Sequence, residues 1–284
     1  MTTIDRPVGR TLTSTDQPKL LESRRGIKIN HWRVLTSELI KLGSLRSTVW
    51  ALLATVAVIM GGGAFAAVGI VVQNEPPAAE SLAADPSGGT LSGVGYAQLA
   101  VIVFGVIAVT GEYRTRMIRS SMAAVPNRLP LVWGKAAVVA AASAISTLAA
   151  LIGTFVVADK VMAVQNLSIS LTTPGMARAL VGAALALGIT AAMATGIGWV
   201  LRNTAGAVAA LFVLLYVIPS FAALLPPAVA RQVAPYLPSS AVGAVTQVGP
   251  AEGLLSAWAG FGVYACYAVF ALAAAAVAVR RRDA

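Results

Sequence analysis

The sequence predicts an all-α membrane protein that crosses the bilayer with six transmembrane helices. Three observations support this prediction. Hydrophobic residues make up 57% of the 284 residues and charged residues only 11%, whereas soluble domains carry about 25% charged residues. The apolar residues fall into long uncharged blocks, as in membrane-spanning helices. Lys and Arg are concentrated in alternate connections between these blocks, which is the charge pattern of a multi-pass membrane protein.

The chain begins with a polar segment and an amphipathic helix. Residues 1–28 are mixed in charge and lack apolar periodicity, which predicts a disordered cytoplasmic tail. A cleaved signal peptide is not expected, because no apolar run occurs within the first 30 residues. A helix over residues 31–47 is then predicted to lie along the membrane surface. The predicted apolar face carries Trp32, Leu35, Leu39 and Leu42, and the polar face carries Arg33, Ser37, Lys41 and Ser44.

Six uncharged blocks follow and complete one transmembrane domain over residues 29–284. Each block has about 18 residues or more, enough to cross a hydrocarbon core of about 30 Å at 1.5 Å per residue. Because the backbone must satisfy its own hydrogen bonds in lipid, the blocks are predicted to be helices. Small residues at helical spacing in the fourth block (Gly188, Ala192 and Gly196) predict close packing. The blocks cover residues 49–72, 94–111, 136–158, 179–201, 204–225 and 257–279.

The basic residues predict the orientation in the membrane. Six spans place both termini on the same side. All but three of the 21 Lys and Arg lie on that side, the exceptions being Lys160, Arg178 and Arg231. The 11 acidic residues divide six to five between the two sides. A bias carried by Lys and Arg alone predicts that both termini are cytoplasmic, in a protein of the plasma (inner) membrane.

The chain lacks the residues that several function classes require. Cys266 is the only cysteine and His31 the only histidine, so we expect neither an internal disulfide nor a metal site built from these residues. Gly134 and Lys135 are not part of a phosphate-binding loop, because Ala136 follows them and the upstream glycine is missing. We expect no catalytic residue and no cofactor in this chain. The net charge of +10 arises mostly from residues beside the spans, so nucleic acid is not an expected partner.

Residues 112–130 form the long polar connection on the predicted cytoplasmic side. The segment combines basic side chains with an apolar strip at helical spacing: Arg114, Arg116 and Arg119 with Met117, Ile118 and Met122. It fits either a docking element for a cytoplasmic partner or an anchor at anionic headgroups. Glu112, at the end of the second block, either pairs with a nearby arginine or belongs to a conformational switch.

Three stretches of the chain resemble the permease subunits of type-2 ATP-binding-cassette (ABC) exporters. The likeness is to the six-span bacterial subfamily in which the ATPase is a separate chain. The stretches are residues 37–48 before the first block, Gly111-Glu112-Tyr113-Arg114 and the loop that follows it as far as Lys135, and residues 202–207 before the fifth block. One position departs from the family pattern. The family often has Gly-Thr where this chain has Arg116-Met117, which makes the loop more basic.

The resemblance implies a permease that exports a substrate with ATP hydrolysed on a partner. ATP and Mg would be bound by a cytoplasmic ABC ATPase, and two permeases, identical or different, would pair in the lipid. The loop at 112–130 would be the coupling element, with contacts from Glu112, Tyr113, Arg114, Arg116, Met117, Ile118, Arg119 and Met122. The resemblance does not identify the substrate or the residues that bind it. The apolar spans favour a hydrophobic or amphipathic one.

Residues 226–255, on the predicted outer side, are too apolar for a solvated loop and too rich in proline for a span. In the family that the chain resembles, short re-entrant helices that cap the exit path occupy this place. Pro226, Pro227, Pro235 and Pro238 would then belong to an outer gate. The alternative is an ordinary apolar loop on the membrane surface.

Two other function classes stay open. The first is a membrane scaffold or assembly protein that transports nothing. The second is an ion-coupled secondary carrier. The predicted span interiors contain no Asp, Glu, Lys, Arg or His, and this disfavours a carrier, because proton or ion coupling usually needs an ionisable group within the membrane.

Overall fold

The computed structural model describes residues 31–44, 46–73, 80, 87–115, 117, 129–167, 169–222, 224–249 and 253–281. These residues form helices and short connections, with no strand among them. Six helical segments within the described ranges are long and apolar enough to cross a membrane. The predicted all-α class and the predicted number of spans are therefore confirmed. The predicted tail at residues 1–28 lies outside the described residues.

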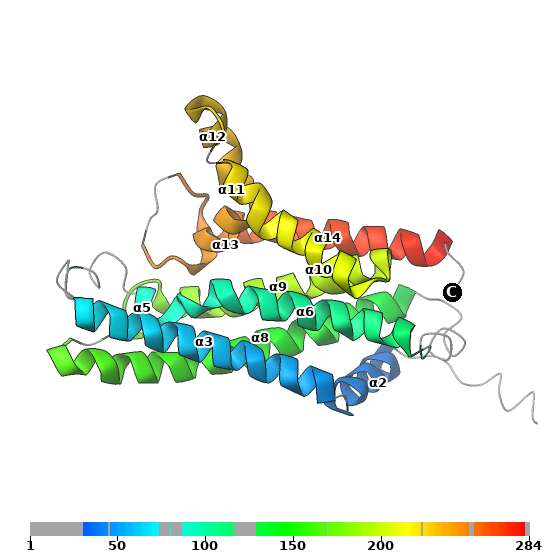
Figure 1. Cartoon of the computed structure of the whole chain (residues 1–284), viewed down its shortest axis with the longest axis horizontal. Helices are drawn as coiled ribbons and strands as arrows, with labels where there is room; N and C mark the ends of the chain where they lie inside the picture. The colour runs from blue at the N-terminus through cyan, green and yellow to red at the C-terminus, as the bar shows by residue number, and fades with distance from the viewer. Residues whose placement is uncertain are drawn as a thin grey trace, which may run out of the picture.

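The six membrane-length segments run alternately in opposite directions. They are α3 (Arg46–Gln73), α6 (Gly93–Arg114), α8 (Leu129–Met162), α9 (Met176–Leu201), a segment that begins with α10 (Thr204–Phe212), and α14 (Ala257–Arg281). Figure 1 shows that α3, α8 and α10 begin at the same end of the bundle at which α6, α9 and α14 end. We call this the charged end, because it carries Arg46, Arg114, Arg202, Arg280 and Arg281. The other end is called the opposite end. Which end faces the cytoplasm stays a prediction.

Helix α9 is the central helix of the bundle. It packs against α6, α8 and α14 and is the most buried of the six segments. A Cβ atom at Gly196 would lie 2.8 Å from the Ala271 backbone of α14, and one at Gly188 would lie 3.0 Å from the Ala140 carbonyl oxygen of α8. A Cβ atom would force a shift at Gly196 and would be tightly crowded at Gly188, which confirms the close packing predicted for the fourth span.

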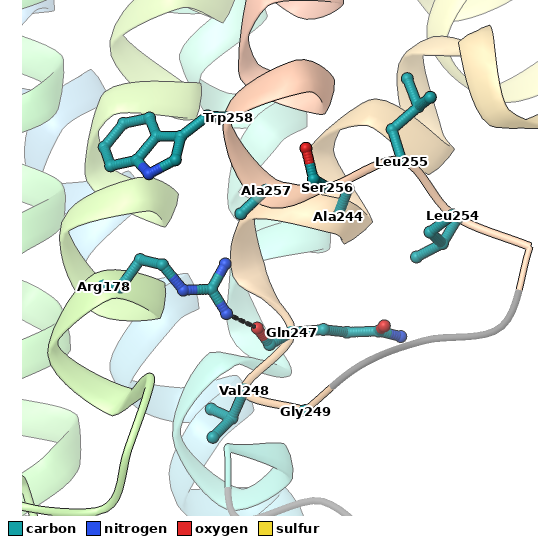
Figure 2. Close-up of a pocket in the computed structure, with 10 residues that line it drawn as sticks. All are labelled: Arg178, Ala244, Gln247, Val248, Gly249, Leu254, Leu255, Ser256, Ala257 and Trp258. Atoms are coloured by element: carbon teal, nitrogen blue, oxygen red, sulfur yellow. Dashed lines mark hydrogen bonds between the residues drawn. The ribbon is translucent and has the colours of Figure 1, made fainter.

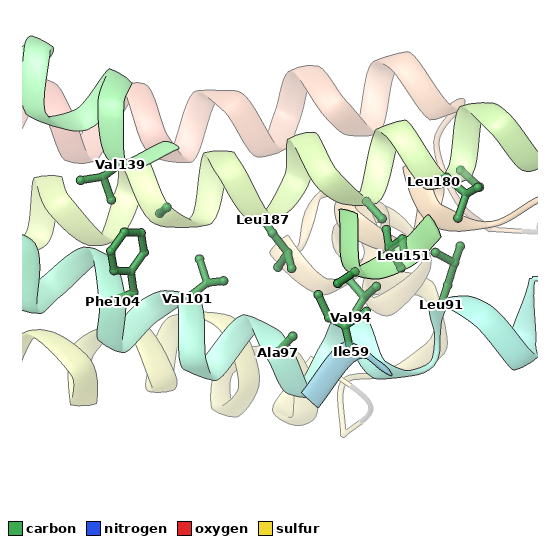
Figure 3. Packing of buried hydrophobic residues seen from close by; sticks show 14 of the residues in the cluster. Ile59, Leu91, Val94, Ala97, Val101, Phe104, Val139, Leu151, Leu180 and Leu187 are labelled. Carbon is green, nitrogen blue, oxygen red and sulfur yellow. The ribbon is translucent and has the colours of Figure 1, made fainter. Parts of the chain in front are cut away.

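The largest buried apolar cluster lies where α3, α6, α8 and α9 meet (Figure 3). The short helix α5 (Gly88–Leu91) adds Leu91 to it. Ile59 and Leu151 are fully buried and Leu187 nearly so. Lipid is as apolar as these side chains, so the cluster is held mainly by close van der Waals packing and not by exclusion of water. At the opposite end, α8 continues into the single turn η1 (Ala163–Gln165).

Helix α2 (His31–Ser44) precedes α3, and the side chains that it buries differ from the predicted apolar face. Leu42 is buried, as expected, whereas Leu39 is 56% exposed and Glu38 is only 1% exposed. The helix packs against α8 and α3. The buried face follows positions 35, 38 and 42. Glu38 can be buried there because Lys135 of α8 forms an ion pair with it. The location of α2 at the membrane surface stays a prediction.

The fifth span and the segment after it consist of short helical pieces. Helix α10 continues through a π-helical turn, η2 (Val213–Val217), into α11 (Ile218–Ala222). Helix α12 (Pro227–Val233), the turn η3 (Ala234–Tyr236) and α13 (Pro238–Thr246) follow. In Figure 1, α11 and α12 lean away from the bundle, while α13 lies beside the start of α14.

The predicted outer-gate prolines mark the boundaries of these pieces. Pro226 caps the start of α12 and Pro227 is its first residue, Pro235 lies in η3, and the buried Pro238 begins α13. Helix α13 packs against α9 and α14 through buried side chains, Ala241, Ala244 and Val245. Every residue of α12 is exposed or half-buried. The segment is therefore largely helical in its described part, and its re-entry into the membrane and its role as a gate stay predictions.

Candidate functional site

Four ionisable side chains meet at the charged end, where α2, α6 and α8 come together. Glu38 and Lys41 come from α2, Glu112 from α6 and Lys135 from α8. Glu38, Glu112 and Lys135 are at most 5% exposed, and Lys41 is partly buried. We call these four residues the charge cluster.

The two lysines each bridge the two carboxylates of the charge cluster. Lys135 Nζ donates to Glu112 Oε1 at 2.8 Å and also to Glu38 Oε2. Lys41 Nζ donates to Glu38 Oε1 at 2.6 Å and lies 3.5 Å from Glu112 Oε1. Two negative and two positive charges therefore balance within one group, and the group joins three helices.

The balance of charges decides whether the four side chains can be buried without destabilising the fold. Removing a charge from water costs several kcal/mol per ion, and the cost is offset only by close, hydrogen-bonded partners. For Lys41, burial lowers the pKa, but the hydrogen bond to Glu38 and the charge of Glu112 outweigh it and hold the pKa above its ordinary value of 10.5. Lys41 therefore stays protonated at neutral pH.

The helices extend further than the uncharged blocks of the sequence. Helix α6 continues to Arg114 and α8 begins at Leu129, so Glu112 and Lys135 lie within helices and not in a loop. The 34 residues of α8 span about 51 Å, compared with about 30 Å for a hydrocarbon core. The charge cluster thus lies where the helices leave their apolar stretches.

The turn between α9 and α10 lies beside this cluster. Arg202 adopts a left-handed conformation (φ 54°) that closes α9, and Asn203 Oδ1 accepts a hydrogen bond from Gly206 N at the start of α10. The Arg202 guanidinium lies 5.0 Å from the ring centre of Tyr113, and this ring contacts Trp199 edge-on at 5.8 Å. A non-glycine residue at positive φ costs free energy, so the surrounding contacts must hold this turn in place.

The predicted coupling residues are only partly described. Glu112 points into the charge cluster, Tyr113 packs against Trp199, and Arg114 and Met117 are exposed. Arg116, Ile118, Arg119 and Met122 lie outside the described residues. Within the charge cluster, the partners of Glu112 are Lys41 and Lys135. The two predicted alternatives, a pair with a nearby arginine or a part in a conformational switch, stay predictions.

Sequence reasoning missed Glu38, Lys41 and Lys135 as members of one site. Glu38 and Lys41 had a local signal, since an acid and a base three residues apart lie on the same helical face. The sequence signal for Lys135 was weaker, because Lys135 is only the last charged residue before an uncharged block. Contact between positions 38, 112 and 135 depends on how three helices pack, which no local pattern contains.

A cavity of about 330 Å³ adjoins the charge cluster on the α6 side. Glu112 Oε2 is buried there and has no hydrogen-bond partner among the described residues. The hydroxyls of Thr110 and Thr204, both lining residues, lie 2.7 Å apart. The charged end therefore offers a recess with both polar and apolar walls, next to the point where the loop at 112–130 leaves α6.

A second polar group lies inside the bundle. Gln98 Nε2 donates to the Tyr264 hydroxyl at 2.8 Å, and the Thr190 and Tyr264 hydroxyls lie 2.7 Å apart. The Tyr216 hydroxyl donates to the Gly95 carbonyl at 2.8 Å. These bonds connect α6, α9, η2 and α14, and all the side chains involved are uncharged at neutral pH.

Comparison with known protein families and with curated protein sequences gives no match. Within the described ranges, no three His, Cys, Asp or Glu side chains are grouped so that they could hold a metal ion. The candidate site is therefore defined by the geometry of this chain alone, as the charge cluster at the base of the loop.

Proposed function

We propose that the chain is the permease subunit of an exporter that is driven by a separate cytoplasmic ATPase of the ABC class. The observation that carries this proposal is the charge cluster. Helix α6 leads into the loop at 112–130 and α8 leaves it, and the Glu112–Lys135 ion pair joins these two helices at the base of the loop. Contacts with Glu38 and Lys41 attach α2 to the same point.

A loop fixed at its base can transmit displacement. If the two ends of the loop moved independently, a push by a partner would bend the loop and leave the spans in place. With the ends joined at 2.8 Å, the same push moves α6, α8 and α2 together. Because α6 and α8 both pack against α9, the displacement would reach the centre of the bundle. This is the property that a coupling element requires.

The remaining features of the proposal follow from the family resemblance. The ATPase partner would bind ATP and Mg, and two permeases would form the transport path in the plasma membrane, with both termini cytoplasmic. The cargo would be hydrophobic or amphipathic. An ion-coupled carrier is less well supported, because the polar group inside the bundle (Gln98, Thr190, Tyr216 and Tyr264) consists of neutral side chains.

Charge reversal in the loop tests the proposal. The tagged chain is purified from membranes of its own host, and the co-purified nucleotide-hydrolysing subunit is quantified together with permease-stimulated ATP hydrolysis. Arg116→Glu combined with Arg119→Glu should reduce both, because two favourable pairings are lost and two repulsive ones are created. At about 0.2–1 kcal/mol for each exposed pair, the contact should weaken by about 1–4 kcal/mol.

Arg24→Glu combined with Arg25→Glu is the matched control and should leave both measurements unchanged. If this control abolishes them while the loop variant does not, the coupling element lies in the N-terminal segment and the assignment to the loop is wrong. A chain that binds partners but never stimulates ATP hydrolysis would be a scaffold.

A further inference from the structure

We propose that the opposite end of the bundle binds one anionic glycerophospholipid. The phosphate would lie on Arg178, and one acyl chain would lie in the groove between α9 and α14. This site is separate from the charge cluster and does not depend on the proposed transport function. Two adjoining cavities carry the inference, one polar and one apolar.

The polar cavity has a volume of about 320 Å³ and holds the Arg178 side chain. Figure 2 shows the guanidinium directed at the Gln247 carbonyl, with Ala257 and Trp258 of α14 beside it. Arg178 Nη2 donates to this carbonyl at 2.6 Å. A guanidinium has five N–H donors, so this bond fixes the group while other donors remain for a ligand. No acidic residue is found among the described residues that line the cavity, and the start of α14 also favours negative charge.

The apolar cavity continues from the polar one, because both are lined by Arg178, Ala257 and Trp258. It has a volume of about 330 Å³, and its walls include Val181, Leu185 and Phe261. Val181 and Leu185 are 47% and 40% exposed, so the groove is open along the side of the bundle. Both volumes lie in the range of about 300–1,000 Å³ that is typical of ligand pockets.

The depth of the two cavities matches the order of groups in a phospholipid. Arg178 is the third residue of α9 and Trp258 the second of α14, so both lie where their spans begin. Tryptophan is enriched at this level of a membrane, beside the headgroups. Leu185 lies seven residues further along α9, about 10 Å deeper at 1.5 Å per residue. The polar cavity is thus at headgroup level and the groove runs into the hydrocarbon.

Arg178 would supply the selectivity. A groove lined only by apolar side chains accepts the acyl chain of any lipid. One fixed cation at headgroup level favours a lipid with net negative charge over a zwitterionic one. The expected preference is about fivefold, the effect of one basic residue at a charged membrane surface.

Quenching of Trp258 fluorescence by lipids with brominated acyl chains tests the proposal. The chain is placed in bilayers of phosphatidylglycerol and phosphatidylcholine, with only one of the two brominated at a time. The emission of Trp258 is isolated by subtracting the signal of Trp258→Phe. Phosphatidylglycerol should quench Trp258 with about fivefold higher relative affinity than phosphatidylcholine.

Three variants isolate the role of Arg178. Arg178→Gln should abolish the preference, while Arg178→Lys, which keeps the charge, should retain most of it. Arg231→Gln is the matched control, because Arg231 lies at the same end on α12 and lines neither cavity; it should leave the preference unchanged. Val181→Phe, which fills the groove without adding a tryptophan, should lower quenching by both lipids.

Each opposite result overturns the proposal. Equal quenching by the two lipids would mean ordinary contact with bulk lipid, and a preference that survives Arg178→Gln would remove the role of the arginine. Quenching by neither lipid would mean that another protein chain covers the groove. Displacement of phosphatidylglycerol by excess inorganic phosphate would indicate a site for a small anion without the acyl chain.

Discussion

Lys135 is a buried basic residue whose charge depends on partners from other helices. Its side chain is 3% exposed, and its ammonium group is held by two carboxylates from two other helices, Glu38 of α2 and Glu112 of α6. Without this lysine, two buried acids would share Lys41 as their one remaining partner within the charge cluster. The stability of the charged end therefore depends on charge balance more than on any single ion pair.

Replacement of Lys135 should show this directly. Lys135→Met should lower the free energy of unfolding by about 3–5 kcal/mol, because it leaves an uncompensated buried charge. Adding Glu112→Gln should restore part of the loss, since Glu38 and Lys41 then remain as a balanced pair. Thermal or denaturant unfolding in detergent measures both variants. Lys160→Met, at an exposed lysine of α8, is the control and should change stability by less than about 0.5 kcal/mol. A double variant less stable than Lys135→Met would contradict the role of charge balance.

At this scale the sequence predicted the components of the site but not their association. It singled out Glu112 because the polarity changes abruptly there. It placed Lys41 on the polar face of a surface helix, where the spacing indicates Glu38 as a partner but not Glu112. The sequence made no prediction for the burial of Glu38, because a charged side chain is buried only when a partner from elsewhere in the chain meets it. Arg116 and Arg119 lie outside the described residues, so their predicted role is untested.

Helices α12 and α13 show how one proline-rich segment is divided between two environments. Both begin with a proline, which is favoured in the first turn because its missing N–H has no partner there in any case. Helix α13 fills the space between α9 and α14 with small side chains, whereas α12 points away from the bundle. The two helices should therefore differ in their accessibility to a reagent in water.

Cysteine labelling measures this difference. In a Cys266→Ala background, Gln232→Cys on α12 should react readily with a membrane-impermeant maleimide. Ala241→Cys on α13 should react at least about tenfold more slowly, because the reagent reaches it only when the structure opens locally. Equal rates would show that α13 does not pack in this way. An unreactive Gln232→Cys would place the exposed face of α12 in lipid.

The boundaries of the spans were predicted less well than their number. The uncharged block predicted for the third span begins at residue 136, whereas α8 begins at Leu129 and contains Pro130 in its first turn. Absence of charge marks the part of a helix that contacts hydrocarbon, not the part that forms hydrogen bonds. A proline in the first turn leaves the helix intact. The extra turns at this end of α8 are the ones that carry Lys135.

For the molecule as a whole, the ends of the bundle decide its orientation. The helices could cross a bilayer in either direction with equal burial of apolar surface. Among the described residues, most Lys and Arg lie at the charged end, whereas Lys160, Arg178 and Arg231 lie at the opposite end. This distribution supports an orientation with the charged end in the cytoplasm.

Labelling of intact cells tests this orientation. In the Cys266→Ala background, Ser170→Cys should react with an impermeant thiol reagent from outside, because Ser170 is exposed in the connection between α8 and α9. Ser14→Cys should react only after the membrane is permeabilised. Reaction of Ser14→Cys in intact cells would reverse the predicted orientation and would also remove the cytoplasmic loop from reach of an ATPase.

The π-helical turn in the fifth span has a consequence for comparing this chain with related sequences. Within η2, Ile218 N–H donates to the Val213 carbonyl five residues earlier, so the turn holds one residue more than an α-helical turn. A relative that lacks one residue between positions 213 and 217 could form an uninterrupted α-helix here. The residues after the gap would keep their faces of the helix, because the five-residue π-turn and a four-residue α-helical stretch rotate the chain by nearly the same angle. An alignment without the one-residue gap would pair side chains that point in different directions.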